Sequence, residues 1–457
     1  MKKTRFLALV CTLTLLLATC LSPLGAAALY ELPEGKTLSS SSAILVALGA
    51  TEDEDVVLYE KEADQKRAPA ALVRIMVGAL ALKTIQEKGI DTATTTGTYT
   101  LQCDNLITGT GVGVAGMRIG DTWTLQDLLT MSMIQTAADA CVTLAFTISG
   151  SETQFVVEMN ALAQEIGCTD TFFTNVTGLD NPNQVTTARD TVKILRYAMS
   201  FPQYGEMMKL TQYTAHPVGG GELTLPNNNN LIRSSSPNSY YSKALFGKTG
   251  FTDLAGYCLA AVAQDGGYEY AAVVLGAPEQ DAEGNNVGLL HYKDIHTLFD
   301  WAFDGFSYKT LLSKNEPVGR LNVNLSWNQD SVVLVPETDF ATVVSKDMDA
   351  ETIIRKVVVD PDTVDAPVTK GQVYGKVELY VNVDQKLGEV NLVASESLER
   401  SDLLVFWQEV QNFLQSPWFW AGIILLALLL IGYIILNIVH NRRRRKKKMR
   451  RVNKKFK

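Results

Sequence analysis

The spacing of apolar residues changes along the chain and predicts a mixed α/β domain first. A helix is expected from about Pro69 to Lys88, ending at Gly89, a residue type typical of helix C-caps. Further helices are expected at 124–149 with a break near Gln135, at 151–167, from Thr187 to just before Pro202, and at 292–306. Strands are expected at 43–48, 56–59, 256–263 and 268–275. Strands at both ends with helices between them predict an α/β sandwich with an antiparallel sheet.

The pattern changes after Pro317, where short β-rich runs with polar turns predict a small all-β domain at 317–395. Residues 401–415 then place apolar side chains at helical spacing, so an amphipathic helix at a membrane interface is expected at 396–416. The stretch from Trp418 to His440 has no Asp, Glu, Lys or Arg and is long enough to cross a bilayer. We therefore expect one transmembrane helix at 417–440.

Both ends of the chain carry positive charge next to apolar runs. Residues 1–28 have a charged start, an apolar run and Ala26-Ala27-Ala28, and they predict a secretory signal peptide. An uncleaved anchor and a lipoprotein signal ending at Cys20 are the alternatives. The basic tail, 441–457, directly follows the apolar stretch, so it is expected in the cytoplasm, with the main domains outside the cytoplasmic membrane. Contact with anionic lipids is the expected role of the tail, and nucleic-acid binding is the alternative.

Between these ends the chain is acidic, although the formal net charge of the whole is only −8. Twelve Lys and Arg residues lie between Arg442 and Lys457, and three more lie within the first five residues. The remainder has 26 basic and 49 acidic residues, a net charge of −23, which argues against nucleic-acid binding by the folded body.

The cysteines and histidines predict neither a disulfide scaffold nor a metal site. Four cysteines outside the leader are widely scattered without a C-x-x-C pair, and the four histidines lack metal-ligand spacing. Neither a metal nor a cofactor is expected.

The start of the first long helix is the most informative stretch. In Pro69-Ala70-Ala71-Leu72-Val73-Arg74, Ala71 and Arg74 are three residues apart, so they share one face near the helix N-terminus. This placement suits a nucleophile and its base, because a helix N-terminus stabilises negative charge. However, Ala71 has no nucleophilic atom and an Arg stays protonated. The stretch has the frame of a serine active site without the reactive groups.

A second motif, Lys248-Thr249-Gly250, precedes an apolar strand and stands within Phe246-Gly247-Lys248-Thr249-Gly250-Phe251-Thr252. In this context the chain resembles the D-alanyl-D-alanine carboxypeptidases, the low-molecular-weight penicillin-binding proteins. The stretches Lys66-Arg67-Ala68-Pro69-Ala70, Asn175-Val176-Thr177-Gly178-Leu179 and Lys370-Gly371-Gln372-Val373 support the resemblance. It implies a penicillin-binding, β-lactamase-like transpeptidase domain at 36–312, followed by the β domain.

In that family a serine attacks the D-Ala-D-Ala amide, a lysine three residues on acts as base, and a Ser-x-Asn motif relays protons. The resemblance places Ala71 at the nucleophile position and Arg74 at the base position. Thr136-Ala137-Ala138 lies at the Ser-x-Asn position, so Thr136 keeps a hydroxyl and Ala138 has lost the Asn. Lys248, Thr249 and Gly250 are intact for substrate binding. The backbone N–H groups of Ala71 and Phe251 are the oxyanion candidates.

Several roles stay open for these residues. Arg74 either adds positive charge for a carboxylate ligand or fills the former lysine space and pairs with an acid. Thr249 either binds ligand or is inherited scaffold. No serine occurs from Ala43 to Met131, so a register shift cannot restore the nucleophile. Thr136 with Lys248 as its base is the remaining candidate.

Three functions follow from these observations. The first is a catalytically inactive homologue that binds peptidoglycan stem peptides, or a related D-Ala-terminated ligand, or a cell-wall partner. The second is an active serine-type D-Ala-D-Ala carboxypeptidase that works through an unidentified residue. The third is a membrane-anchored scaffold.

Overall fold

The computed structural model describes residues 30–280, 289–383 and 385–453. The predicted signal peptide falls outside these residues. By its internal contacts the chain divides into two units, of which the first contains residues up to 309 together with 341–353 and 381–386. The second contains 310–340, 354–380 and 387–457.

An antiparallel five-stranded sheet is the centre of the first unit, with strand order β2-β1-β9-β8-β7. Its strands are β1 (Ser42–Ala47), β2 (Val56–Lys61), β7 (Ala244–Thr252), β8 (Gly256–Asp265) and β9 (Tyr268–Ala277). A hairpin joins β8 to β9 through Gly266 and Gly267, both with positive φ. Small two-stranded sheets are formed by β3 (Thr96–Thr98) with β4 (Thr122–Thr124), by β5 (Gln212–Ala215) with β6 (Leu223–Pro226), and by β10 (Phe306–Leu312) with β13 (Phe340–Ser345).

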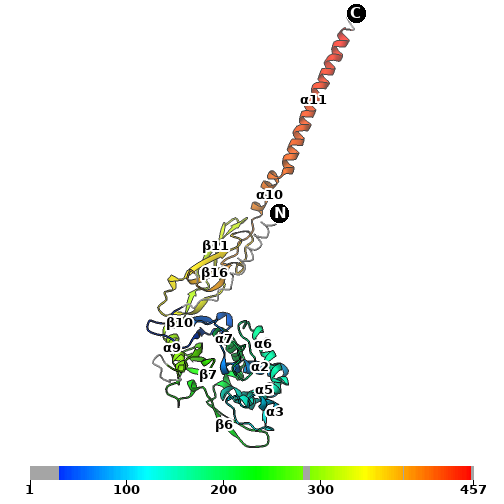
Figure 1. The fold of residues 1–457 in the computed structure, drawn as a ribbon. Helices are drawn as coiled ribbons and strands as arrows, with labels where there is room; N and C mark the ends of the chain where they lie inside the picture. The colour runs from blue at the N-terminus through cyan, green and yellow to red at the C-terminus, as the bar shows by residue number, and fades with distance from the viewer. Residues whose placement is uncertain (1–29, 281–288, 384, 454–457) are drawn as a thin grey trace, which may run out of the picture. The chain divides into compact units, whose positions relative to one another are not determined.

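Helices cover both faces of this sheet (Figure 1). The helices of the first unit are η1 (Glu52–Glu54), η2 (Ala70–Leu72), α2 (Val73–Lys88), α3 (Leu101–Asn105), α4 (Leu125–Ile134), α5 (Ala138–Ser149), α6 (Glu152–Glu165), α7 (Ala188–Met199), α8 (Pro202–Met208), η3 (Asn230–Ile232) and α9 (Leu290–Gly305). Ile44 and Val46 of β1 join the core beneath α2, α4, α5 and α7, while Ala43 and Leu45 join a second core beneath α9. This alternation follows from the two-residue period of a strand.

The helix boundaries agree with the sequence patterns at most positions. The predicted break near Gln135 separates α4 from α5, and Gly89 ends α2 in the left-handed conformation with φ 61°. Two short helices were not predicted. Thr100 caps α3 by accepting a hydrogen bond from Cys103 N, and Pro202 is the first residue of α8, so the proline that ends one predicted helix also begins the next.

The approach to α2 is tightly packed. Ala70 has φ 46°, and two glycines lie against the short helix η2. A Cβ on Gly178 would lie 2.3 Å from Ala70 O, and a Cβ on Gly250 would lie 2.7 Å from Ala71 N. Both positions therefore require glycine, because a side chain there would displace backbone. This contact joins β7 and the segment at 178 to the start of α2.

The second unit contains a six-stranded sheet of order β14-β16-β17-β12-β11-β15. Its strands are β11 (Gly319–Asn324), β12 (Ser331–Pro336), β14 (Ile354–Val359), β15 (Thr363–Asp365), β16 (Val373–Asn382) and β17 (Gln385–Ala394). The short helix η4 (Ala350–Thr352) precedes β14. The predicted β-rich domain is therefore present.

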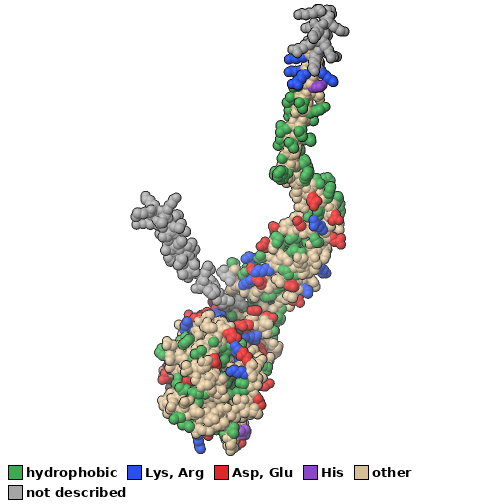
Figure 2. Space-filling view, turned by 90° about the vertical axis from the view of Figure 1, so that its right-hand side faces the viewer, with side chains coloured by type: hydrophobic (Ala, Val, Ile, Leu, Met, Phe, Trp, Pro, Cys, Tyr) green, Lys and Arg blue, Asp and Glu red, His purple; other side chains and the backbone are tan. Residues whose placement is uncertain are grey.

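Two further helices follow the sheet, and both were expected. The amphipathic pattern forms α10 (Asp402–Gln415), which is capped by Ser401. The apolar stretch forms α11 (Pro417–Asn453), which continues beyond His440 into the basic tail. Residues 417–446 are long and apolar enough to cross a membrane. Figure 2 shows apolar side chains along this helix and Lys and Arg side chains beyond them.

The contact between Gly178 and η2 gives a test of this packing. We expect Gly178→Ala to lower the free energy of unfolding by about 2 kcal/mol more than Gly150→Ala. Gly150 also has positive φ, 77°, but has no atom within 4 Å of an added Cβ, so it isolates the strain of the backbone conformation. The measurement is chemical denaturation of both variants. Equal destabilisation would show that the segment at 178 yields to an added methyl group.

Candidate functional site

Arg74 lies in the first turn of α2 and is 1% exposed. Its guanidinium donates to Ser132 O at 3.1 Å, Ala137 O at 3.2 Å and Thr177 O at 3.3 Å. Its Nε is buried without a hydrogen-bond partner. The guanidinium is therefore buried, and its partners are backbone carbonyl oxygens rather than the acid that one of the two open roles required.

Thr136 stands in the connection between α4 and α5 with φ 62°, a conformation that β-branched residues rarely adopt. Strain of this kind costs about 1–3 kcal/mol and persists only where the surroundings hold it. Two donors do so, because Lys248 Nζ lies 2.5 Å and Asn228 Nδ2 2.6 Å from Thr136 Oγ1. With two donors on its oxygen, the hydroxyl has its own hydrogen available for a further acceptor.

Lys248 is a buried cation in the centre of β7, only 2% exposed. Its ammonium also donates to Thr249 O at 3.2 Å. Burial and, secondarily, the positive charge of Arg74 lower the pKa of Lys248 to about 7. Within the part of the chain that the structure describes, neither Lys248 nor Arg74 has a carboxylate within salt-bridge distance. The site is therefore positively charged and suits an anionic group.

The remaining predicted residues lie on η2 and β7. Ala71 is in η2 and its backbone N lies against Gly250, as described above. Thr249 is partly exposed on β7, and Phe251 is 44% exposed with its ring 4.3 Å from that of Tyr257. The structure thus brings the helix start, the α4–α5 connection and the Lys-Thr-Gly strand together.

Ala138 is buried at the first position of α5, where its N–H donates to Gly113 O at 2.9 Å. The next residue, Asp139, accepts hydrogen bonds from the backbone N–H groups of Ala115, Gly116 and Met117, each at 2.9 Å. These contacts hold the glycine-rich loop at 109–117 beside Thr136. Asp139 therefore has a structural role.

Asn228 is a site residue that the sequence analysis missed. Besides its contact with Thr136, its backbone N–H donates to Ile134 O at 2.9 Å. The run Asn227 to Asn230 was visible in the sequence, but nothing in it indicated which amide would face a hydroxyl 92 residues away. Asn228 therefore brings an amide to the site from another segment, near the helix where Ala138 lacks one.

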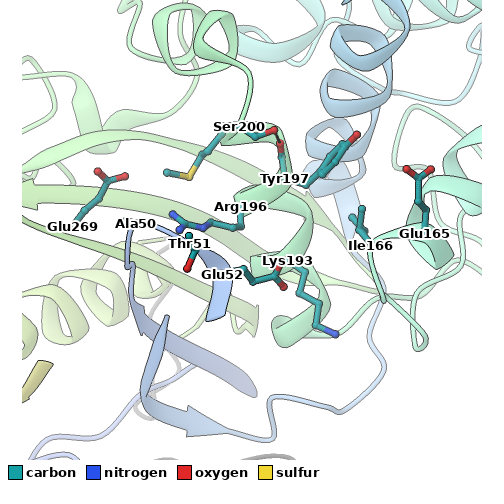
Figure 3. Close-up of a pocket in the computed structure, with 11 residues that line it drawn as sticks. Ala50, Thr51, Glu52, Glu165, Ile166, Lys193, Arg196, Tyr197, Ser200 and Glu269 are labelled. Atoms are coloured by element: carbon teal, nitrogen blue, oxygen red, sulfur yellow. Dashed lines mark hydrogen bonds between the residues drawn. The ribbon is translucent and has the colours of Figure 1, made fainter. Parts of the chain in front are cut away.

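A separate pocket of about 720 Å³ contains none of these residues (Figure 3). Its cations are already bonded, since Lys193 donates to Gly167 O at 2.8 Å and Arg196 donates to Gly49 O at 2.6 Å. Arg196 also lies 3.4 Å from Asp55. This arrangement leaves neither cation free for an anionic ligand, and we assign the pocket no role.

Comparison with known proteins identifies the family. A family model described as D-alanyl-D-alanine carboxypeptidase matches residues 30–279, which is more than half of the chain. The chain belongs to the D-alanyl-D-alanine carboxypeptidase family. A second model, the C-terminal domain of penicillin-binding protein 5, matches residues 306–400. The resemblance seen in the sequence is confirmed at the level of the family.

Relatives in this family match most of the chain. The carboxypeptidase DacD of Salmonella typhimurium is 28% identical over 351 residues, which cover 76% of this chain and 84% of the relative. The carboxypeptidase DacC of Escherichia coli is 28% identical over 380 residues, which cover 79% of this chain and 86% of the relative. The carboxypeptidase DacF of Bacillus subtilis is 25% identical over 370 residues, which cover 80% of this chain and 88% of the relative.

Solved structures agree in fold. Penicillin binding protein 5 from Haemophilus influenzae has a TM-score of 0.61 and 22% identity, covering 80% of this chain and 99% of that chain. The carboxypeptidase DacD from Francisella tularensis has a TM-score of 0.64 and 19% identity, covering 83% of this chain and 98% of that chain. The predicted penicillin-binding transpeptidase domain followed by a β domain is therefore confirmed as the fold.

Burial of Lys248 has a consequence for stability. In the pH range from about 7 to 10 the unfolded chain binds a proton at Lys248 that the folded chain has lost, so stability rises with pH. We expect Lys248→Met to raise the free energy of unfolding at pH 7 by about 2 kcal/mol, because a desolvated charge is removed. The difference in the free energy of unfolding between Lys248→Met and the unchanged protein should become smaller as the pH approaches 10, because the unchanged protein gains stability over this range.

Chemical denaturation at several pH values measures this effect. The matched control is Lys209→Met, which replaces an exposed lysine after α8 and for which we expect no such gain. A gain for Lys248→Met that stays constant up to pH 10 would contradict the lowered pKa.

Proposed function

We propose that the protein binds D-alanine-terminated stem peptides of peptidoglycan, or a related ligand, without hydrolysing them. The proposal depends above all on Arg74, which we assign to the base position of the family. A guanidinium cannot accept a proton from a nucleophile. It is moreover 1% exposed and bonded to three carbonyl oxygens, so it is held in the protein rather than poised at a reacting atom.

The neighbouring residues are consistent with this loss. We assign Ala71 to the nucleophile position, where a methyl group offers no atom for acyl transfer. Ala138, at the position of the second-motif Asn, offers no amide. Binding needs fewer groups than turnover. The positive charge of Lys248 and the partly exposed hydroxyl of Thr249 suit a terminal carboxylate.

A second candidate function is hydrolysis with Thr136 as nucleophile and Lys248 as base. One observation favours it, because Lys248 Nζ lies 2.5 Å from Thr136 Oγ1 and has a pKa of about 7. This distance and this pKa are those a general base requires at neutral pH. Against it, Lys248 donates to Thr136 Oγ1 in this structure, so the lysine must first lose a proton and this hydrogen bond must reverse before Lys248 can accept the hydroxyl proton.

We also propose that α11 spans the cytoplasmic membrane, with the two units outside and the basic tail at the inner surface. The apolar run followed at once by Arg442 to Lys446 supports this orientation. The tail is then placed to contact anionic lipids rather than nucleic acid.

The first test separates binding from hydrolysis. We expect the purified full-length protein to form no covalent adduct with a labelled penicillin and to release no D-alanine from a D-Ala-D-Ala peptide. We expect the same peptide to bind in calorimetry, and Lys248→Met to weaken that binding at least about tenfold, because a charged partner of the carboxylate is lost. Intact-protein mass spectrometry detects the adduct. An adduct that disappears in Thr136→Ala would favour the second function.

The second test restores the missing groups. We expect Ala71→Ser with Arg74→Lys to be acylated by penicillin, but roughly 100-fold more slowly than an active relative, because the second motif still lacks its Asn. Ala71→Ser alone is the control and should stay inactive while Arg74 remains. Acylation at the rate of an active relative would show that Ala138 does not limit the site.

A further inference from the structure

The turn between β11 and β12 presents a large aromatic side chain to solvent. Trp327 is 66% exposed, more than the exposed apolar residues Ile354, Val357 and Val373 of the same unit. The turn starts at Leu325, which has φ 60°. A leucine in this conformation is strained by about 1–3 kcal/mol, so the surrounding contacts hold the turn in a defined shape.

Those contacts tie the turn to the segment that leads into α10. Ser401 N donates to Leu325 O at 2.7 Å. At the other side of the turn, Gln329 donates to Glu396 Oε1 at 2.9 Å in the amide orientation that satisfies both its oxygen and its nitrogen. Ser401 is also the N-cap of α10. Trp327 therefore belongs to a turn fixed at the N-terminal end of this helix.

The helix α10 exposes a set of apolar side chains and is joined directly to the proposed membrane span. These side chains are Leu403, Phe406, Trp407, Phe413 and Leu414, each at least 45% exposed. The chain leaves helical geometry at Ser416, with ψ 136°, and α11 begins at Pro417. The two helices are thus separate segments, and Phe413 meets Phe419 with ring centroids 5.2 Å apart.

From this arrangement we propose that the second unit docks on the outer surface of the bilayer through Trp327 together with the apolar face of α10. The inference rests on the proposed membrane span of α11. A helix that buries one apolar face in the interface lies along it, so both of its ends reach the interface. The N-terminal end carries the Trp327 turn with it. An indole suits this depth, because it combines an apolar ring with a hydrogen-bonding N–H.

The charge of α10 indicates which property of the lipid matters. The helix contains Asp402 and Glu409 and has no Lys or Arg. Attraction to anionic headgroups therefore does not hold it at the membrane. Insertion of its apolar side chains holds the helix at the membrane instead. Docking should therefore be the same on zwitterionic and anionic bilayers and insensitive to salt.

The test uses the full-length protein in phosphatidylcholine vesicles, with and without phosphatidylglycerol. Trp327→Cys, Thr338→Cys and Trp420→Cys each receive an environment-sensitive fluorophore. Thr338 is exposed at the opposite end of β12 and is the matched control, while Trp420 reports insertion of α11. The described native cysteines are buried, and the unchanged protein gives the labelling background. Because Trp327 is largely exposed, its replacement should not disturb folding.

We expect lipids with shallow quenchers to quench the label at 327 about threefold more than the label at 338, because interfacial groups lie ~5–10 Å into the headgroup region. Equal values in both lipid mixtures support apolar docking. If the label at 420 is quenched and the label at 327 is not, the docking inference is overturned and the proposed membrane span stands. Quenching at neither position overturns both. A label at 327 that is shielded from aqueous quenchers but not reached by lipid quenchers identifies a protein partner and also overturns the inference.

Discussion

The buried guanidinium of Arg74 holds together three segments that form the candidate site. It connects α2 to the last turn of α4 through Ser132 O, to the residue before α5 through Ala137 O, and to the segment before Gly178 through Thr177 O. A guanidinium can do this because its donors are spread over a rigid plane, whereas an ammonium is a point charge on a flexible stem. Arg74, a residue that cannot accept a proton, therefore fixes the geometry around Thr136.

Charge is the second constraint on this site. Two cations are buried close together, and carbonyl and hydroxyl oxygens supply the contacts that a carboxylate would otherwise provide. Such oxygens satisfy the N–H groups but do not neutralise the positive charge. The pKa of Lys248 is lowered because its ammonium is buried beside Arg74 without a carboxylate. An arrangement of this kind costs stability in the free protein and favours a ligand that brings negative charge.

Much of the fold could be predicted from the sequence because it depends on local signals. Gly89 and the break near Gln135 marked helix ends correctly, and the motifs at Pro69 and Lys248 indicated the family. What the sequence could not reveal depends on the folded backbone. Nothing local indicates that Arg74 faces three carbonyl oxygens, or that Asn228 meets Thr136. The helices α3 and α8 were missed because they are short, and their starts are marked only by the capping side chain of Thr100 and by Pro202.

The pKa of Lys248 has a thermodynamic consequence for any ligand that the site takes up. A carboxylate placed beside this ammonium stabilises its charged form, so a ligand that binds above pH 7 draws a proton from solution. Under the proposed function, peptide occupancy and proton concentration become linked quantities, with affinity falling up to about tenfold for each pH unit above 7. On that proposal, together with the proposed orientation of α11, the acidity at the outer face of the membrane sets how firmly the site holds its ligand.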